Sequence, residues 1–359
     1  MGVQFIEAQI KFRISDIINQ PNFHLEDLVF PAASGHISPI TSNPADSSLV
    51  LVQLNYFDCG SLALSMLISH KIADASTMST FFNDWAAVAR QLLPNGDHIP
   101  SPQFIGASLF PPVEDPTMLK LYAVPKRETC LTRRFLFHAS KIAELKAMAT
   151  SSGVDNPTRV EVVTALILKC AMSASRANSG SFRPSVFRNA ANLRQITIPP
   201  LPQNSVGNFI TVYPVVLENE DDVRFPELVS KLRNGRRKIQ NEYREKHKFD
   251  PIQEFQSTLA KREGIVKKFD LYHCSSMCRF PFYDVDFGWG RPSLGRYATK
   301  LGQRNSFIMM DLRNGKGVDG IQAMVTLEKP QVCLFEANDE LLTYASLNGE
   351  NEWPYPHGF

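Results

Sequence analysis

The feature that most restricts how this chain can fold is a proline-dense segment from Pro94 to Arg127. It carries prolines at positions 94, 100, 102, 111, 112, 116 and 125, and its apolar residues follow no clear period. A structureless stretch of this length is uncommon inside one compact domain. The chain has 359 residues, and roughly 100–200 residues usually form one domain. The segment therefore predicts a crossover between two lobes.

Helical and strand-like patterns occur on both sides of this crossover, which predicts an α/β architecture. Two apolar runs flank the turn residues Asp58-Cys59-Gly60, a pattern typical of a β-hairpin. Strands are expected at Met1–Ile14, Leu49–Phe57, Leu62–Ser69, Ser185–Leu193, Phe209–Leu217, Phe282–Phe287, Phe307–Leu312 and Ile321–Leu327. Helical spacing of apolar residues predicts helices at about Ser76–Leu92, Ala139–Ser151, Thr158–Ala177, Phe225–His247 and Pro330–Ser346.

Composition indicates which partners and which cellular compartment to expect for the protein. The net charge is only +2, so there is no broad electrostatic case for a nucleic-acid or membrane partner. No apolar run approaches the ~20 residues that span a bilayer, and the first residues lack the apolar core of a signal peptide. We therefore expect a cytoplasmic protein, and we take it to be a monomer. Its six cysteines are expected to be free thiols in a reducing compartment.

The sharpest chemical pattern is Ser69-His70-Lys71-Ile72-Ala73-Asp74. His70 falls where an apolar strand gives way to a loop and then a helix. A histidine titrates near neutrality and can accept a proton from a hydroxyl or an amine, although a purely structural histidine fits the same spacing. Asp74 could orient His70 as in a triad, or it could pair with an arginine and brace the turn. We favour the brace, because two side chains four residues apart across such a turn point in different directions.

Two further polar patterns lie at predicted strand ends. In Asp286-Phe287-Gly288-Trp289-Gly290 two glycines flank a tryptophan, which indicates tight backbone geometry, and a simple packed turn is the alternative. Asn192-Leu193-Arg194 is compatible with nothing more than a capped strand end. Cys274 and Cys278 lack a second pair of ligands, and structural zinc usually needs four, so we predict no metal site. Phosphate-binding loops and GxSxG elbows are absent from the sequence.

The three motifs, taken in order, resemble those of the plant BAHD acyltransferases, and within that family the alkaloid-acetylating branch. They are His-Lys-Ile-Ala-Asp from His70, Asn-Leu-Arg from Asn192, and Asp-Phe-Gly-Trp-Gly-Arg-Pro from Asp286. Each motif alone is weak, whereas the ordered set is highly specific. The resemblance extends from Gly2 to about Ser346.

This resemblance implies a two-lobe fold like that of chloramphenicol acetyltransferase, with mixed sheets and a central channel. His70 would be the general base that takes the proton of an acceptor alcohol as its oxygen attacks the thioester. The co-substrate would be an acyl-coenzyme A, with acetyl-coenzyme A the leading candidate, and no cofactor would be permanently bound. The resemblance groups Asp74 and Asp286 with His70 at the catalytic site, assigns structural roles to Asn192 and to Arg194 as the ion-pair partner of Asp74, and places Ser275, Gly288, Trp289 and Gly290 on the coenzyme A side.

The resemblance also sets lobe boundaries and raises two alternatives. The first lobe would comprise residues 1–105 with about 287–310, the crossover 106–130, and the second lobe 131–286 with 311–359. The chain begins on the order of 90 residues later than is usual in the family, and Ser275-Ser276-Met277 stands where the family has Thr-Ser-Trp, so an oxyanion donor is lost. A truncated, catalytically impaired form is therefore one alternative, and an N-acyltransferase acting on an amine is the other.

Overall fold

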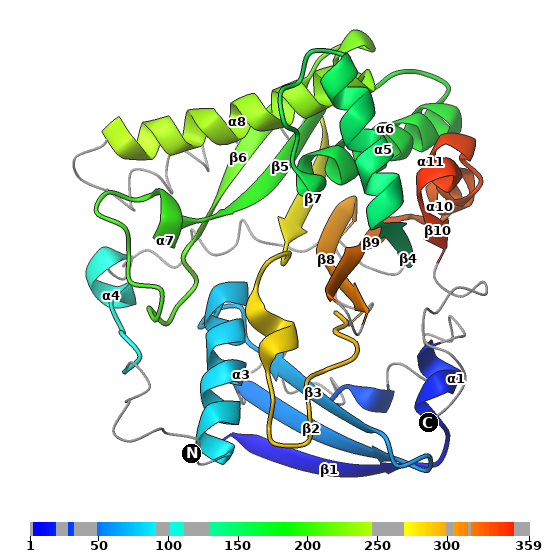
Figure 1. Cartoon of the computed structure of the whole chain (residues 1–359). Helices are drawn as coiled ribbons and strands as arrows, with labels where there is room; N and C mark the ends of the chain where they lie inside the picture. Colours follow the sequence, from blue (N-terminus) through cyan, green and yellow to red (C-terminus); the bar gives the residue numbers. More distant parts are fainter. Residues whose placement is uncertain are drawn as a thin grey trace.

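The computed structural model describes residues 3–18, 28–31, 49–90, 101–110, 130–245, 269–298, 304–314 and 317–347. Its strands form two sheets in two lobes, as Figure 1 shows. One sheet has three strands in the order β1-β2-β3, and the other has seven in the order β10-β4-β9-β8-β7-β5-β6. The predicted α/β class with two lobes and mixed sheets is confirmed.

The first lobe is built around the predicted hairpin. Strand β2 (Val50–Phe57) pairs antiparallel with β3 (Leu62–Ile68), and β1 (Gln4–Ile10) pairs parallel with β2. The first strand is shorter than expected, because the chain forms helix α1 (Ile14–Ile18) directly after it. Helix α3 (Ala75–Ala89) lies against this sheet on the side that faces the second lobe.

The second lobe holds the main hydrophobic core. Its sheet contains β4 (Cys130–His138), β5 (Ser185–Asn192), β6 (Ile210–Leu217), β7 (Asp270–Ser276), β8 (Ser306–Asn314), β9 (Gly317–Glu328) and β10 (Ser346–Leu347). Its helices are α5 (Ala139–Ser151), α6 (Arg159–Ser179), α7 (Leu193–Ile196), α8 (Phe225–Glu245), α10 (Lys329–Glu336) and α11 (Asp339–Tyr344). Helix α6 contributes Val162, Leu166 and Ile167, each 0% exposed. Full burial of such a side chain stabilises a fold by about 1.5–3 kcal/mol, so α6 anchors this core.

Two of the expected elements differ in the structure. The predicted strand Phe282–Phe287 is wrong: Pro281–Asp284 forms the 3-10 helix η4, with the proline at its start, where the missing N–H costs nothing. The predicted closing helix is interrupted, because the Asn338 side chain accepts a hydrogen bond from Leu341 N at 2.9 Å and thereby starts α11 as a separate helix. Strands β4 and β7 were not predicted.

The chain between β7 and β8 leaves the second lobe and runs beside α3 (Figure 1). The Arg296 guanidinium donates to the carbonyls of Ile17 and Ile18 at 3.2 and 3.3 Å, so this segment contacts the first lobe through a side chain. Residues 288–298 form no strand. The expected boundary at 310 is wrong, because β8 begins at Ser306 and pairs with β7 and β9 of the seven-stranded sheet.

Of the predicted crossover, only residues 101–110 and Cys130 lie within the described parts. This stretch contains the short helix α4 (Gly106–Leu109). The Gln103 backbone donates to Asn204 O at 3.0 Å and accepts from Val206 N at 2.9 Å, so its described portion packs on the second lobe. The rest of the predicted crossover, and His247 at the end of a predicted helix, lie outside the described residues. In the described part of the chain, no helix is both long and apolar enough to cross a membrane.

Candidate active site

His70 lies in the turn between β3 and α3, with an exposed side chain. Its strand ends at Ile68, and Ile72 N donates to Ser69 O at 3.0 Å to close the turn. Asn208, from the second lobe, donates from its side chain to the His70 carbonyl at 2.9 Å. The backbone of His70 is thus held from the opposite lobe, while its imidazole remains accessible to a substrate.

Asp74 does not orient His70. Its Oδ1 accepts from Thr77 N at 2.9 Å, which caps helix α3. Its Oδ2 accepts from Arg194 Nη1 at 2.6 Å and from Phe209 N at 2.9 Å. The side chains of Asp74 and Arg194 are 3% and 0% exposed. The predicted ion pair is confirmed, and within the described structure no hydrogen bond joins Asp74 to the His70 ring.

Arg194 donates further hydrogen bonds to acceptors around this pair. Its Nη2 donates to Thr77 Oγ1 at 3.0 Å, to Ser205 O at 2.9 Å and to Gly207 O at 3.3 Å. Its guanidinium carbon lies 4.8 Å from the centroid of the Phe209 ring, within range of a cation–π interaction. Asn192, also predicted to be structural, accepts from Arg194 N at 3.0 Å. These contacts join α3 of the first lobe to the chain around β5 and β6 of the second.

Asp286 organises the turn that carries the two glycines. Its Oδ1 accepts from Gly288 N at 2.8 Å and from Gly290 N at 3.1 Å, and its Oδ2 lies 3.6 Å from Arg90 Nη1. The hydrogen bond from Gly288 lowers the pKa of Asp286, and the Gly290 N–H and nearby Arg90 act in the same direction. Both glycines have φ above +100°, a conformation that side-chain-bearing residues rarely adopt. The two N–H hydrogen bonds to Asp286 therefore shape the turn, and its ion pair with Arg90 links the turn to the end of α3.

The aromatic residues of this motif pack on helix α3. The rings of Phe287 and Trp85 meet edge to face with centroids 4.9 Å apart, and Phe287 stacks on Trp289 at 5.3 Å. Trp289 is 61% exposed. The predicted coenzyme A residue Ser275 is an exposed residue of β7, and the described contacts do not bring it together with Gly288, Trp289 or Gly290.

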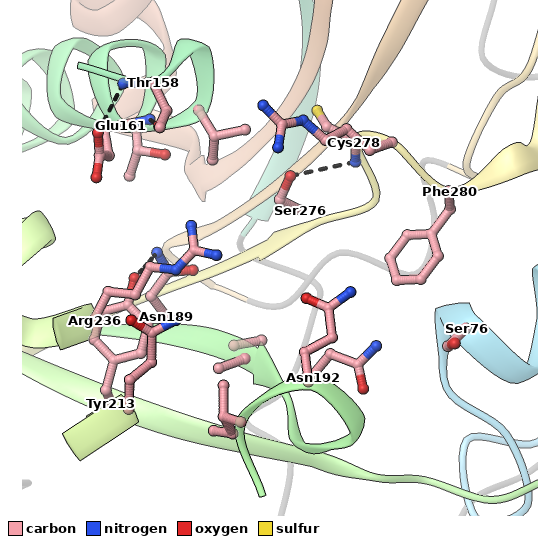
Figure 2. A pocket seen from close by; sticks show the side chains of 18 of the residues that line it. Ser76, Thr158, Glu161, Asn189, Asn192, Tyr213, Arg236, Ser276, Cys278 and Phe280 are labelled. Atoms are coloured by element: carbon pink, nitrogen blue, oxygen red, sulfur yellow. Dashed lines mark hydrogen bonds between the residues drawn. The ribbon is translucent and has the colours of Figure 1, made fainter. Parts of the chain in front are cut away.

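A cavity of about 530 Å³ lies at the junction of the lobes. Figure 2 shows side chains from α6, β5, β6, α8 and the end of β7 around it, with Ser76 of α3 on the side of the first lobe. His70 is not among its lining residues. Ser79 and Thr80, on the second turn of α3, line the cavity. Helix α3 directly follows the turn that carries His70.

Positive charge surrounds this cavity. Arg159, Arg236 and Arg279 line it, together with Glu161. Burial acts to raise the pKa of Glu161, but hydrogen bonds from Arg233 and from the Thr158 backbone outweigh it, so the pKa is lowered. Glu161 is already paired with Arg233 at 2.7 Å, and Arg159 with Asp311 at 3.0 Å. The other two lining arginines, Arg236 and Arg279, therefore leave the wall suited to an anionic ligand.

A neutral hydrogen-bonding pair completes the wall. Asn189 Nδ2 donates to Tyr213 Oη at 2.8 Å, across neighbouring positions of β5 and β6. Burial raises the pKa of Tyr213 well above its usual range, so the phenol keeps its proton near neutrality. Because the oxygen accepts from Asn189, its own proton can be donated to a carbonyl in the cavity.

Two cysteines near the cavity have unreactive thiols. Burial raises the pKa of the Cys274 and Cys278 thiols to about 12. Because the thiolate is the reactive and metal-binding form, neither residue suits nucleophilic catalysis. Among the residues that the structure describes, no group of three or more histidines, cysteines and carboxylates is placed to hold a metal ion.

Sequence reasoning missed most of the lining contributed by α6, β5 and α8. The exception is Asn192 at the end of β5, which was predicted to be structural and lines the cavity. One local signal was available at α6: Thr158 and Glu161 form a capping box, a pattern visible as Thr-x-x-Glu. Arg159 at the first position of the helix is a second signal, since the helix dipole disfavours a cation there. Asn189, Tyr213 and Arg236 carry no comparable signal, because tertiary packing alone brings them together.

Comparison with known proteins adds to this geometry. A family model described as the Transferase family matches residues 1–342. The chain is 44% identical to akuammiline synthase 1 of Alstonia scholaris, covering 96% of this chain and 78% of the relative. It is 40% identical to 17,18-epoxy-17-hydroxycur-19-ene N-malonyltransferase of Strychnos nux-vomica, with coverages of 97% and 72%. It is 36% identical to deacetylvindoline O-acetyltransferase of Catharanthus roseus, with coverages of 96% and 78%.

The fold has a solved counterpart. The chain is similar to the crystal structure of vinorine synthase, with a TM-score of 0.79 and 30% sequence identity, covering 97% of this chain and 78% of that one. This similarity confirms the predicted two-lobe fold of the chloramphenicol-acetyltransferase type.

Proposed function

Because this chain belongs to the Transferase family, whose plant members are the BAHD acyltransferases, we propose that it transfers a small acyl group from coenzyme A to a hydroxyl of an alkaloid, with His70 as the general base. The observation that carries the proposal is the position of His70: an exposed imidazole at a strand end, whose backbone is fixed from the other lobe by Asn208. Enzymes of this family use coenzyme A thioesters as co-substrates.

The proposed chemistry follows from this placement. The neutral His70 imidazole accepts the proton of the acceptor hydroxyl while the hydroxyl oxygen forms a bond to the thioester carbonyl carbon. Collapse of the tetrahedral intermediate breaks the carbon–sulfur bond, and the imidazolium returns the proton to the departing sulfur. A histidine imidazole can both accept and donate a proton near neutrality, as these two steps require. Asp74 takes no part, because it is fully engaged by Thr77, Arg194 and Phe209.

The cavity beside α3 is the proposed binding site for the acyl-coenzyme A. Coenzyme A carries several phosphate charges, and Arg159, Arg236 and Arg279 offer guanidinium groups around the cavity, a residue type suited to phosphate recognition. Ser275, at the end of the strand that contributes Ser276 to the same wall, is a proposed contact of the pantetheine end. Gly288, Trp289 and Gly290 stay proposed contacts on that side.

The acceptor class is inferred from the relatives. Deacetylvindoline O-acetyltransferase, as its name states, transfers acetyl to oxygen, which supports a hydroxyl acceptor and an acetyl donor here. A second candidate is transfer to nitrogen, favoured by the similarity to an N-malonyltransferase. The two candidates are separated by presenting matched alcohol and amine acceptors with acetyl-coenzyme A and with malonyl-coenzyme A.

Replacing His70 by alanine tests the proposal. General-base catalysis contributes about 10²–10⁴-fold, so His70→Ala should lower kcat by that factor while coenzyme A binding and the circular dichroism spectrum stay unchanged. Release of free coenzyme A from acetyl-coenzyme A, over a panel of alkaloid alcohols, is the measurement.

The matched control is His138→Ala. His138 is half-buried and its Nδ1 lies 3.3 Å from Asp319 on β9, away from the lining of the cavity. This variant should keep its turnover. Wild-type turnover by a folded His70→Ala protein on an accepted alcohol would refute His70 as the base.

A further inference from the structure

Asp311 is a buried carboxylate on β8 that belongs to none of the sequence motifs. It is 4% exposed. Its Oδ1 accepts from Arg159 Nη2 at 3.0 Å, and its Oδ2 accepts from Arg279 N at 2.8 Å. Each carboxylate oxygen therefore holds a different segment of the chain, and both segments line the cavity.

The first segment is the start of helix α6. Arg159 is the first residue of that helix, where the helix dipole disfavours a cation. Its guanidinium is kept there by Asp311 and by the Gly320 carbonyl, to which Nη1 donates at 3.4 Å. The Asp311 carboxylate thus fixes one wall of the cavity.

The second segment is the turn that follows β7. Arg279 has φ of 70°, a left-handed conformation uncommon for residues other than glycine. The Asp311 carboxylate binds its N–H directly, while Met277 N donates to Met309 O at 2.7 Å and Cys278 N to Ser276 Oγ at 3.3 Å. This turn connects Ser275 and Ser276 to the next wall of the cavity, so its conformation sets their placement.

We propose that Asp311 is a positioning residue for the acyl-coenzyme A cavity, holding Arg159 and the Ser276–Phe280 turn at the separation that a coenzyme A ligand requires. The inference rests on the proposed function, because it takes coenzyme A as the occupant. Removing the charge of Asp311 releases Arg159 and leaves the strained Arg279 backbone with a weaker acceptor. Arg159 and the Ser276–Phe280 turn are then no longer held at the separation that the ligand requires.

The test is the dissociation constant of coenzyme A, measured by titration calorimetry on the full chain. We compare wild type, Asp311→Asn and the control Asp319→Asn, and record a melting temperature for each. Asp319 lies on the neighbouring strand β9 and pairs with His138, which does not line the cavity. It therefore matches Asp311 in residue type without holding a lining residue. Loss of one hydrogen bond to a charged group weakens binding by about 10- to 100-fold. We expect a loss of this size in the coenzyme A affinity of Asp311→Asn, with Asp319→Asn unchanged.

Coenzyme A affinity equal to wild type in Asp311→Asn overturns the proposal, whatever happens to its melting temperature, since a purely structural role moves only the latter. If Asp311→Asn does not fold, Asp311→Glu replaces it, because glutamate keeps the charge but displaces the carboxylate. Unchanged affinity in that variant also overturns the proposal, and a loss of about tenfold supports it. A wild-type chain that binds no coenzyme A refutes the proposed function itself, which the wild-type titration alone decides.

Discussion

At the scale of single residues, the junction of the lobes depends on a charge that has no contact with solvent. Arg194 is 0% exposed and donates to Asp74, Thr77, Ser205 and Gly207, which come from both lobes. A buried guanidinium is tolerated when it is paired and hydrogen-bonded. Here Nη1 and Nη2 are bonded, whereas Nε has no partner among the described residues. The pair therefore acts on folding, and His70 four residues upstream of Asp74 depends on it only for position.

Asp74→Ala should destabilise the protein far more than it slows chemistry. Removing one partner of a buried ion pair leaves the other charge uncompensated, so the free energy of unfolding should fall by about 3–5 kcal/mol. Urea denaturation measures this. Glu144→Ala is the control, because its pair with Lys141 lies at the surface with side chains 50% and 42% exposed and contributes about 0.5 kcal/mol or less. A loss below about 1 kcal/mol in Asp74→Ala would contradict the structural role of the pair.

At the scale of elements, sequence patterns predicted the strands and helices whose formation depends on contacts between residues close in the chain. The hairpin before His70 and the helix after it were predicted because their apolar residues follow strand and helix periods. The apolar residues after Pro281 gave the wrong element, because the proline starts a 3-10 turn whose Tyr283 is buried against β8, with its hydroxyl donating to Asp311 O at 3.1 Å. The cavity was out of reach, since Arg159 and Asp311 are 152 positions apart and only the packing of α6 against the sheet brings them together.

The ion pair between Glu161 of α6 and Arg233 of α8 should make the free energy of unfolding depend on pH. Hydrogen bonds from Arg233 and Thr158 outweigh burial and lower the pKa of Glu161. A carboxylate whose pKa is lower in the folded state contributes stability that is complete above its unfolded pKa, about 4.3, and is lost as the pH falls through the folded value. Urea denaturation of wild type and Glu161→Gln should therefore differ by a constant amount above about pH 5 and converge below it. A difference that does not vary between neutral and acidic pH would contradict this assignment.

At the scale of the whole molecule, charge is nearly balanced overall and unbalanced locally. The net charge is +2, yet Arg236, Arg237 and Lys238 follow one another on the exposed side of α8, and Arg236 lines the cavity. A local positive field beside a binding site attracts an anionic ligand and is screened by salt. Coenzyme A is such a ligand.

Arg236→Gln should raise the KM for acetyl-coenzyme A by about tenfold, the effect of losing one hydrogen bond to a charged group of about 1.5–3 kcal/mol. The dependence of KM on salt should become weaker at the same time. Arg237→Gln is the matched control, since it removes the same charge from the next position without touching the cavity lining, and only the salt dependence should change. Equal KM values in the two variants would show that Arg236 does not contact the ligand.

The excursion of the chain between β7 and β8 has a consequence for how this architecture can be recombined. Strands β7 and β8 are adjacent in the centre of the seven-stranded sheet, but the chain that joins them first reaches α3, where Phe287 packs on Trp85, and α1, where Arg296 binds two carbonyls. A single crossover in a gene, placed anywhere between the lobes, cannot exchange one lobe for that of a relative. It would pair an α3 from one parent with a Phe287 turn from the other. Exchange of whole lobes requires three coordinated breakpoints, one after α3 and one on each side of the excursion between β7 and β8, so a lobe cannot be exchanged as one contiguous block of sequence.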